Sequence, residues 1–345
     1  MRLDAKATIG IGVTAFLLWF ILRDVPFVEV WANLRDAHWG LLLASVAVAT
    51  AGFLIRALRW QVLLAPILPK SSLRNRFAAV NIGFMANNLI PARVGEFARA
   101  YALARVEPVR VSAVFGSLVV ERVLDGLVLL GILLGAMASP GFPKIATFQE
   151  GPLASALDAI LIGMFGLTLV LGGLLVFPRA TVRIVERLAR RLPAGFARPI
   201  VDALEAFLGS LAVLRSPRLL ALAVLWSVGF WLWHGLSFWL GMLAFDIDAG
   251  LVAAYFTEAV VGFAVAIPAA PGFFGTFHAG AGWALSVFGV PDARALAFAF
   301  GYHLGGFIPV TVIGLYYAAR IGLSLGDVGA SGKRVEEAVE QERPA

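Results

Sequence analysis

The sequence predicts an all-α polytopic membrane protein with about six full spans and two broken or re-entrant hairpins, or about eight hydrophobic helices. Three observations predict this fold class. The 345 residues are 60% hydrophobic and only 14% charged, whereas about a quarter of a soluble domain is charged. Apolar runs of spanning length recur along the chain, and the basic residues are concentrated in alternate loops. The apolar excess is too large for one soluble core and is therefore expected to face lipid.

The uninterrupted apolar runs lie near 9–22, 39–55, 111–137, 156–177, 219–243 and 295–319. The first run follows Arg2 and Lys6 as a signal peptide would, but no small-residue cleavage site comes after it. We therefore expect an uncleaved first span.

Two further apolar regions are interrupted. Residues 77–91 end at Pro91, and residues 251–289 are broken by a turn of Pro, Ala and Gly at 268–272. We expect the first region to dip into the membrane from the cytoplasm and return, and the second to enter from outside. For 251–289, two full spans that meet at a cytoplasmic turn stay open as the alternative.

The distribution of Lys and Arg predicts the orientation. Of the 28 basic residues, 23 fall in segments on the side of the N-terminus, 4 fall in the opposite loops, and Arg122 falls inside a span. Because basic loops stay in the cytoplasm, both termini are expected there, in a multi-pass protein of the inner (cytoplasmic) membrane. The net charge of +6 is then a feature of topology, and no nucleic-acid partner is expected.

The sequence predicts one transmembrane domain over 1–325, followed by a charged, disordered cytoplasmic tail over 326–345. The longest polar segment, 178–218, has Arg179, Arg183 and Arg187 four residues apart, with apolar residues between them. This pattern is typical of an amphipathic helix on the cytoplasmic leaflet, held by anionic phospholipid headgroups. A simple basic connector stays open as the other interpretation.

Composition also bears on cofactors. Cysteine is absent, and the four histidines are scattered at 38, 234, 278 and 303. A disulfide framework and a thiol nucleophile are excluded, and a zinc site is disfavoured. We expect no metal and no cofactor.

The stretch from 81 to 105 is the most informative. A proline ends the incoming helix, a glycine permits close backbone approach, and three ionisable residues spaced by three share one face if a helix restarts there. Such a broken helix suits an anionic headgroup; an interfacial Arg–Glu pair is the competing interpretation. The residues concerned are Asn87, Asn88, Pro91, Arg93, Gly95, Glu96 and Arg99.

A second constellation lies inside the apolar run 111–137. Glu121, Arg122 and Asp125 are expensive to bury there and mark a pathway or an internal partner. Arg122 and Asp125 are expected to pair, and Glu121 is expected to reach Arg93 or Arg99 on a neighbouring helix. A purely structural ion pair stays open.

The third constellation repeats, after 180 residues, the pattern P-x-x-x-G-x-F that begins at Pro91. The repeat begins at Pro271, its glycine is Gly275, and Gly272 lies between them. Two interrupted segments that enter from opposite faces are typical of an inverted repeat with its substrate site at the meeting point. Glu258 and His278, beside the second break, are candidates to couple proton movement to transport. A Glu258 capped by neighbouring hydroxyl or backbone groups stays open. Trp residues 226, 231, 233 and 239 in the run 219–243 are attributed to an interfacial aromatic belt.

These motifs resemble a known family. The runs R-A-L-R-W at 56–60, N-N-L-I-P-A-R-V-G-E-F-A-R at 87–99 and E-R-V-L-D at 121–125 are similar to those of the lysylphosphatidylglycerol synthase transmembrane, or flippase-like, family. The resemblance covers about residues 5–325. It implies a role in moving a modified lipid across the bilayer. The soluble domain that attaches the amino acid in the synthases is not expected here, because the polar segments of this sequence are too short to form it. The family's later P-G-G-x-G-x-x-E element differs here, because a single Gly272 follows Pro271 and His278 stands near the usual acid.

The sequence therefore favours a transport-type protein, a translocase for an anionic or modified lipid, over an enzyme. The alternative is an integral-membrane transferase for a polyprenyl-linked or phospholipid substrate, with Glu96, Glu121 or Asp125 as its acid or base. A scaffold for lipid enzymes is a third hypothesis. A homo-oligomer and partners from lipid- or glycan-pathway enzymes stay open.

Overall fold

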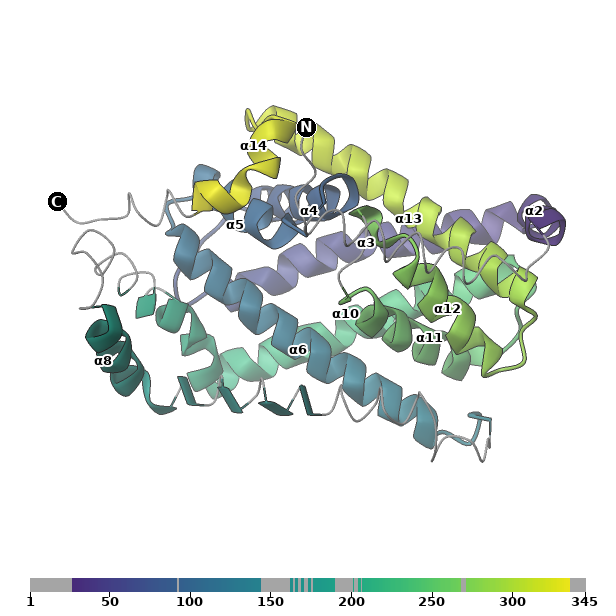
Figure 1. Ribbon diagram of the computed structural model, residues 1–345, viewed down its shortest axis with the longest axis horizontal. Coiled ribbons are helices and arrows are strands. Elements are labelled where there is room, and N and C mark those ends of the chain that lie inside the picture. Colours follow the sequence, from purple (N-terminus) through teal and green to yellow (C-terminus); the bar gives the residue numbers. More distant parts are fainter. Residues whose placement is uncertain are drawn as a thin grey trace.

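The computed structural model describes residues 27–143 except 92, scattered residues of 162–176, then 177–189, 201, 204, 205, 207–267 and 271–335. Every regular element in these ranges is a helix (Figure 1). The expected first span near 9–22, most of the expected span at 156–177, and residues 268–270 lie outside the described residues. In chain order the helices are α2 (Phe27–Arg35), α3 (Trp39–Leu64), α4 (Leu73–Leu89), α5 (Gly95–Val106), α6 (Val111–Ala138), α8 (Pro178–Ala189), η2 (Leu211–Arg215), α10 (Pro217–Ala244), α11 (Gly250–Ala264), η3 (Pro271–Phe273), α12 (Thr276–Ser286), α13 (Asp292–Arg320) and α14 (Leu325–Gly329).

Three of these helices are long and apolar enough to cross a membrane. They are α3, α10 and α13, with 26, 28 and 29 residues, where about 20 residues suffice. Helix α6 has 28 residues but carries three ionisable residues near its middle. The all-helical fold is thus confirmed for the described residues, and three of the helices are candidate membrane spans. The count of six spans and the re-entrant hairpins stay predictions.

The starts of α3 and α13 lie beside the end of α10. The backbone amide of His38, just before α3, donates to the carbonyl of Ala244 at the end of α10, at 2.8 Å. Near the start of α13, Arg294 donates to the carbonyl of Asp246 at 3.2 Å. Since α3 and α13 begin where α10 ends, α10 runs antiparallel to both, and the three helices lie along the long axis of the molecule (Figure 1). Loops that the basic-residue tally assigns to one side do gather at one end.

Two pairs of shorter helices are interrupted where the Pro and Gly residues predict. Helices α4 and α5 have 17 and 12 residues, and α11 and α12 have 15 and 11. The amide of Ser72 and the side chain of Asn75 both donate to Glu107 Oε1, at 2.9 and 2.7 Å. The start of α4 therefore lies beside the end of α5, so this pair is a hairpin that enters and leaves at one end of the molecule.

The two breaks share one feature of backbone geometry. Arg93 and Phe273 occupy equivalent positions in the repeated P-x-x-x-G-x-F pattern, and their φ angles are +54° and +59°. Both fall in the left-handed region, which is uncommon for residues with a side chain. The φ angles of Gly272 and Gly275 at the second break are also positive, at +73° and +89°. The inverted repeat stays a prediction, now with a shared local conformation beside the shared sequence.

The sequence predicts a disordered tail from residue 326, whereas the first part of that tail is helical. Residues of α14 and 331–335 form helix, and Val328 is buried against the core. Ser324 and Asp327 form a capping box at the start of α14. Hydrogen bonds from Ser324 hold the pKa of the Asp327 carboxyl below its usual range. Apolar side chains within the charged segment explain the difference, and residues 336–345 lie outside the described part.

The predicted amphipathic segment at 178–218 is described in part. Its first turns are α8, on which Arg179, Arg183 and Arg187 recur every four residues. Its end forms η2 and the start of α10. Contact of α8 with a lipid leaflet stays a prediction.

Candidate functional site

Six charged residues from three helices form one buried cluster. The sequence predicts a span over 39–55 and assigns Arg56 and Arg59 to the cytoplasmic segment that follows it. Instead α3 continues to Leu64, and Arg56 and Arg59 are only 6% and 0% exposed. Because α3 keeps its helical geometry, their side chains reach α6. The cluster consists of Arg56, Arg59, Arg99, Glu121, Arg122 and Asp125.

Glu121 is the centre of this cluster and has no exposed surface. Arg99 donates to both of its oxygens, at 2.7 and 2.9 Å. Arg59 and Arg122 approach Oε1 at 3.1 and 2.7 Å. An unpaired buried carboxylate would be very costly, and these contacts offset that cost. Of the two partners that the sequence proposes for Glu121, Arg99 is the one that binds it.

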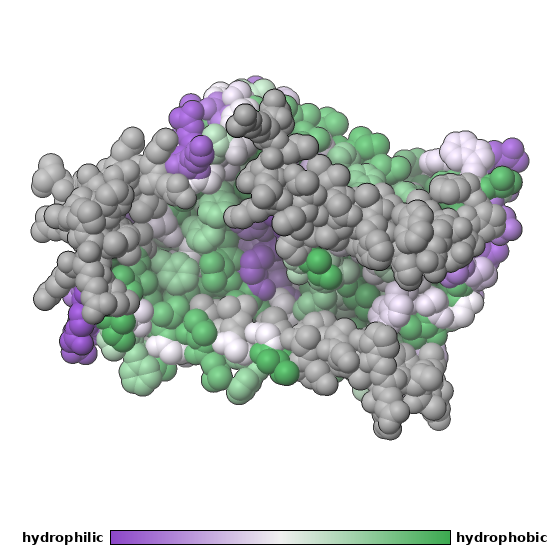
Figure 2. All heavy atoms as spheres, in the orientation of Figure 1, coloured by the Kyte–Doolittle hydropathy of each residue, from purple (hydrophilic) through white to green (hydrophobic). Residues whose placement is uncertain are grey.

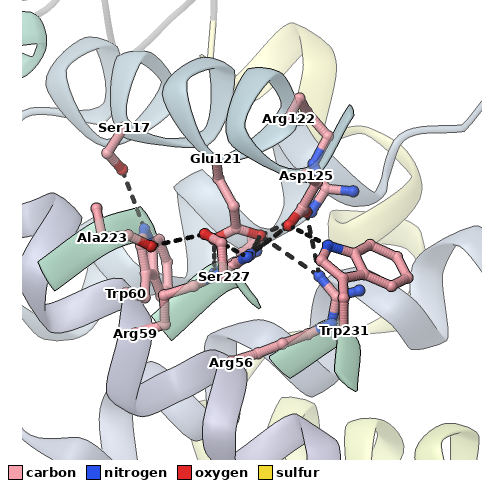
Figure 3. Close-up of polar contacts among 11 residues, drawn as sticks. Arg56, Arg59, Trp60, Ser117, Glu121, Arg122, Asp125, Ala223, Ser227 and Trp231 are labelled. Carbon is pink, nitrogen blue, oxygen red and sulfur yellow. Dashed lines mark hydrogen bonds and ion pairs between the residues drawn. The ribbon is translucent and has the colours of Figure 1, made fainter. Parts of the chain in front are cut away.

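Asp125 lies one turn further along α6 and binds three donors. Arg59 Nη1 is 2.5 Å from Oδ1, and Arg122 Nη2 is 3.2 Å from Oδ2, the predicted contact three residues apart. The indole of Trp231 on α10 donates to Oδ1 at 3.0 Å. Trp231 is buried, so its assignment to an interfacial belt is wrong. Figure 3 shows side chains of α3 and α10 converging on the carboxylates of α6.

The cluster is not electrically balanced. Its four arginines face two carboxylates, which leaves two positive charges in excess. Arg56 is the least satisfied of them: its Nη1 lies 3.7 Å from Glu121 and 3.5 Å from Asp125. Within the described residues this buried nitrogen makes no hydrogen bond. A buried donor without an acceptor is costly, so Arg56 is the arginine of the cluster whose burial is least compensated.

A cavity of about 320 Å³ opens beside the cluster. Pockets for small ligands begin at about this volume. Arg122 is 43% exposed at its side chain, and Figure 2 shows hydrophilic atoms recessed in the middle of a largely hydrophobic face. The cavity is lined largely by apolar groups and places several ionisable side chains within it. Its ionisable lining is Arg56, Arg93, Glu96, Arg99, Arg122 and Asp125.

The break between α4 and α5 forms one wall. The side chain of Asn87 accepts a hydrogen bond from the amide of Gly95, at 2.8 Å. A Cβ on Gly95 would lie 2.3 Å from the carbonyl oxygen of Gly83, so only glycine fits. Because α5 begins at Gly95, Arg93 precedes the helix. The prediction that Arg93 shares a helical face with Glu96 and Arg99 is therefore wrong, although all three line the cavity.

Arg93 joins the two breaks. Its Nη1 donates to the carbonyl of Ala266, after α11, at 2.5 Å. Its guanidinium lies 5.4 Å from the ring centroid of Phe273 in η3. Pro271, Gly272 and Gly275 shape this second break without lining the cavity, which Phe273 does. Asn88 also lies elsewhere, since it donates to Thr311 on α13 at 2.8 Å.

Glu258 and His278 are not part of this cavity. The sequence proposes them as a pair, but the imidazole that contacts Glu258 belongs to His234 on α10, at 2.8 Å. His278 packs against the ring of His303 on α13, with centroids 5.2 Å apart. The described residues contain no group of three or more His, Cys, Asp or Glu placed to hold a metal ion.

Sequence reasoning missed Arg56, Arg59, Trp231 and His234. A signal was present at the first two, because Arg56 and Arg59 are three residues apart on an apolar helix that no Pro or Gly ends before Leu64. Trp231 and His234 share the same spacing, yet they lie in an aromatic-rich segment where such spacing is common.

Comparison with known proteins identifies relatives along most of the chain. The family described as the lysylphosphatidylglycerol synthase TM region matches residues 7–314. Glycosyltransferase AglD of Haloferax volcanii is 26% identical over 307 residues, which are 80% of this chain and 48% of that protein. The chain thus spans about half of that relative's length. A UPF0104 membrane protein of Methanocaldococcus jannaschii is 23% identical over 318 residues, covering 90% of this chain and 93% of the relative. No solved structure matches the chain.

Proposed function

Because the chain belongs to the lysylphosphatidylglycerol synthase transmembrane family, we propose that this membrane protein is a lipid translocase that binds an anionic or modified headgroup. The observation that carries the proposal is the excess of arginine in the charged cluster beside the cavity, where three of the four arginines are buried. Four arginines face two carboxylates there, and Arg56 keeps a donor without an acceptor. A phosphate would satisfy that donor and reduce the excess positive charge.

Guanidinium groups suit this task. Their planar donors match phosphate oxygens, and the resulting charge-assisted hydrogen bonds are about twice as strong as neutral ones. The cavity of about 320 Å³ has room for a headgroup rather than for acyl or prenyl chains. The chains would stay in the bilayer while the headgroup enters through the side where Arg122 is exposed.

The two hairpins supply a route. We place the chain in the cytoplasmic membrane with both termini inside, so that α4–α5 enters from the cytoplasm and α11–α12 from the opposite side. Each of these helices has 17 residues or fewer, which is short for a full span. Their breaks touch through Arg93, beside the cavity. A substrate site between two discontinuous segments is the arrangement that alternating access requires.

A transferase is the second candidate, favoured by one observation. Glu96 lines the cavity and makes no ion pair within the described residues, whereas Glu121 and Asp125 are bound by arginines. Glu96 is thus a carboxylate available as a general base, and the name of the relative AglD is that of a glycosyltransferase. Consumption of an activated sugar donor that stops in Glu96→Gln would support this alternative.

Transport of a labelled lipid in proteoliposomes tests the translocase. The probe is phosphatidylglycerol that carries a fluorophore on one chain, near the headgroup. A chemical quencher added outside the vesicles reports how much probe remains in the outer leaflet. Arg56→Gln should slow its movement about tenfold to a hundredfold, because one charge-assisted hydrogen bond contributes about 1.5–3 kcal/mol. The matched control is Arg74→Gln, an exposed arginine at the start of α4, which should move the probe at the wild-type rate. Equal rates for Arg56→Gln and wild type would contradict the assignment.

A further inference from the structure

A second buried polar site lies between α10 and α11, apart from the headgroup cavity. Glu258 is 1% exposed, and its Oε1 is 2.8 Å from Nδ1 of His234. Its other oxygen, Oε2, is buried and has no hydrogen-bond partner among the described residues. A Cβ on Gly235 would lie 2.7 Å from that oxygen, so the glycine lets α10 approach the carboxyl closely. No arginine or lysine forms an ion pair with Glu258 in the described part of the chain.

This pair is neutral only when it holds a titratable proton. A protonated carboxyl beside a neutral imidazole has no net charge, and neither does a carboxylate beside an imidazolium. Removing that proton leaves one negative charge in an apolar interior, where uncompensated charge is costly. Glu121 and Asp125 avoid the cost with arginine partners, but Glu258 does not. The pair is therefore built to bind and release one proton.

The pair is connected to the headgroup cavity through two aromatic side chains. Phe230 stacks on the ring of His234 with centroids 5.6 Å apart, and the Arg56 guanidinium lies 4.0 Å from the Phe230 centroid on the cavity side. Trp231 packs edge-on to His234 at 5.8 Å and donates to Asp125. Phe230 and Trp231 thus lie between the pair and the cavity-lining residues Arg56 and Asp125.

Other titratable groups surround the pair without forming an ion pair with it. Arg56 is the charged group that faces it from α3. Tyr255 on α11 donates to the carbonyl of Leu232, and Tyr302 on α13 shares a hydrogen bond with Ser237 at 2.6 Å. Of the other helices that pack against α10 or α11, α12 carries His278 and α6 carries Arg122 and Asp125.

We propose that Glu258 and His234 form a proton-binding site whose occupancy is coupled to the cavity, so that a proton moves together with the anionic headgroup. The positive charge of Arg56 determines whether anion binding favours or opposes protonation of the pair. With the cavity empty, this positive charge stabilises the deprotonated pair. An anion bound to Arg56 cancels that charge and favours proton uptake, and by linkage the protonated pair binds the anion more tightly. The inference rests on the proposed translocation.

Proteoliposomes with an imposed pH gradient test the coupling. The same labelled phosphatidylglycerol should move several-fold faster along a proton gradient in wild type. Glu258→Gln, which keeps a neutral hydrogen-bonding side chain, should move the probe without any response to the gradient. The matched control is Asp248→Asn, an exposed acid in the loop after α10, which should respond as wild type does. If Glu258→Gln responds to the gradient as wild type does, or if wild type does not respond, the proposed coupling is overturned. Transport of the probe without a gradient would still support the translocase.

Infrared spectroscopy of the purified protein gives a readout that does not need transport. A protonated carboxyl band should be present in wild type, absent in Glu258→Gln and altered in His234→Gln. Addition of phosphatidylglycerol should increase this band, whereas phosphatidylcholine should not. A spectrum without a Glu258-dependent band, or a band indifferent to the anionic lipid, overturns the proposal even if no lipid movement is found.

Discussion

The carboxylate of Glu121 is bound at 2.7 Å by two arginines whose surroundings differ. The side chain of Arg99 is 5% exposed, while that of Arg122 is 43% exposed. Arg99 also lies over the ring of Trp60, at 3.9 Å from its centroid. Distance alone would assign the two contacts the same importance. Solvent screening separates them, because the contact of the more exposed Arg122 is screened more strongly than that of the buried Arg99.

We expect Arg99→Gln to lower the free energy of unfolding by about 3–5 kcal/mol, since it leaves a buried carboxylate with fewer partners. Arg122→Gln should cost about 1 kcal/mol or less. Unfolding of the two variants in detergent, followed by denaturant titration, measures the difference. Equal losses would mean that water does not reach Arg122.

At this scale the sequence located four of the six residues of the charged cluster, Arg99, Glu121, Arg122 and Asp125. Glu121, Asp125 and Arg99 were predictable because a charge in an apolar run requires a partner, and the helical spacing limits where that partner lies. Arg56 and Arg59 were not, because an arginine after an apolar run is also the ordinary mark of a span's cytoplasmic end. The partner of Glu258 was missed for a similar reason: His278 is nearer in sequence, but His234 lies on the helix that packs against Glu258.

Among the helices, the α4–α5 hairpin depends on two glycines in close contact. A Cβ on Gly95 would meet the backbone of Gly83 and the side chain of Asn87, at 2.3 and 2.5 Å. Backbone atoms cannot move aside as a flexible side chain does. The two helices would have to separate, and the wall of the cavity would separate with them.

We therefore expect Gly95→Ala to destabilise the protein by about 1–3 kcal/mol or more through overpacking and to reduce movement of the labelled lipid. The control is Gly131→Ala on α6, where an added Cβ meets nothing within 4 Å. That change should be neutral or stabilise by up to about 1 kcal/mol, because alanine favours helix. Thermal unfolding and transport are measured on both variants. A Gly95→Ala protein as stable as Gly131→Ala would contradict the close approach.

Helix positions were predictable where hydrophobicity alone decides them, as for α6, α10 and α13. Breaks were also predictable, because proline and glycine act locally. The register after a break was not: α5 starts at Gly95, which takes Arg93 off the helical face it was expected to share. The ordered α14 was missed because Val328 gains its stability from distant core residues rather than from its charged neighbours.

At the scale of the whole molecule, the two groups of loops lie at opposite ends of the long helices (Figure 1). The loop after α10 is at one end, beside the starts of α3 and α13. At the other end Arg105, near the end of α5, contacts the carbonyl of Ile321 after α13. The excess of Lys and Arg predicts that this second end is cytoplasmic.

The absence of cysteine allows this orientation to be measured directly. We expect a membrane-impermeant maleimide to label Asp248→Cys in intact cells, because residue 248 is exposed in the loop after α10. Lys333→Cys, exposed beyond α14, should react only after the membrane is permeabilised. The chain without a substitution has no thiol and serves as the negative control. The reverse pattern would invert the protein in the membrane, so that the α4–α5 hairpin would enter from the outside and the headgroup cavity would be reached first through α11–α12.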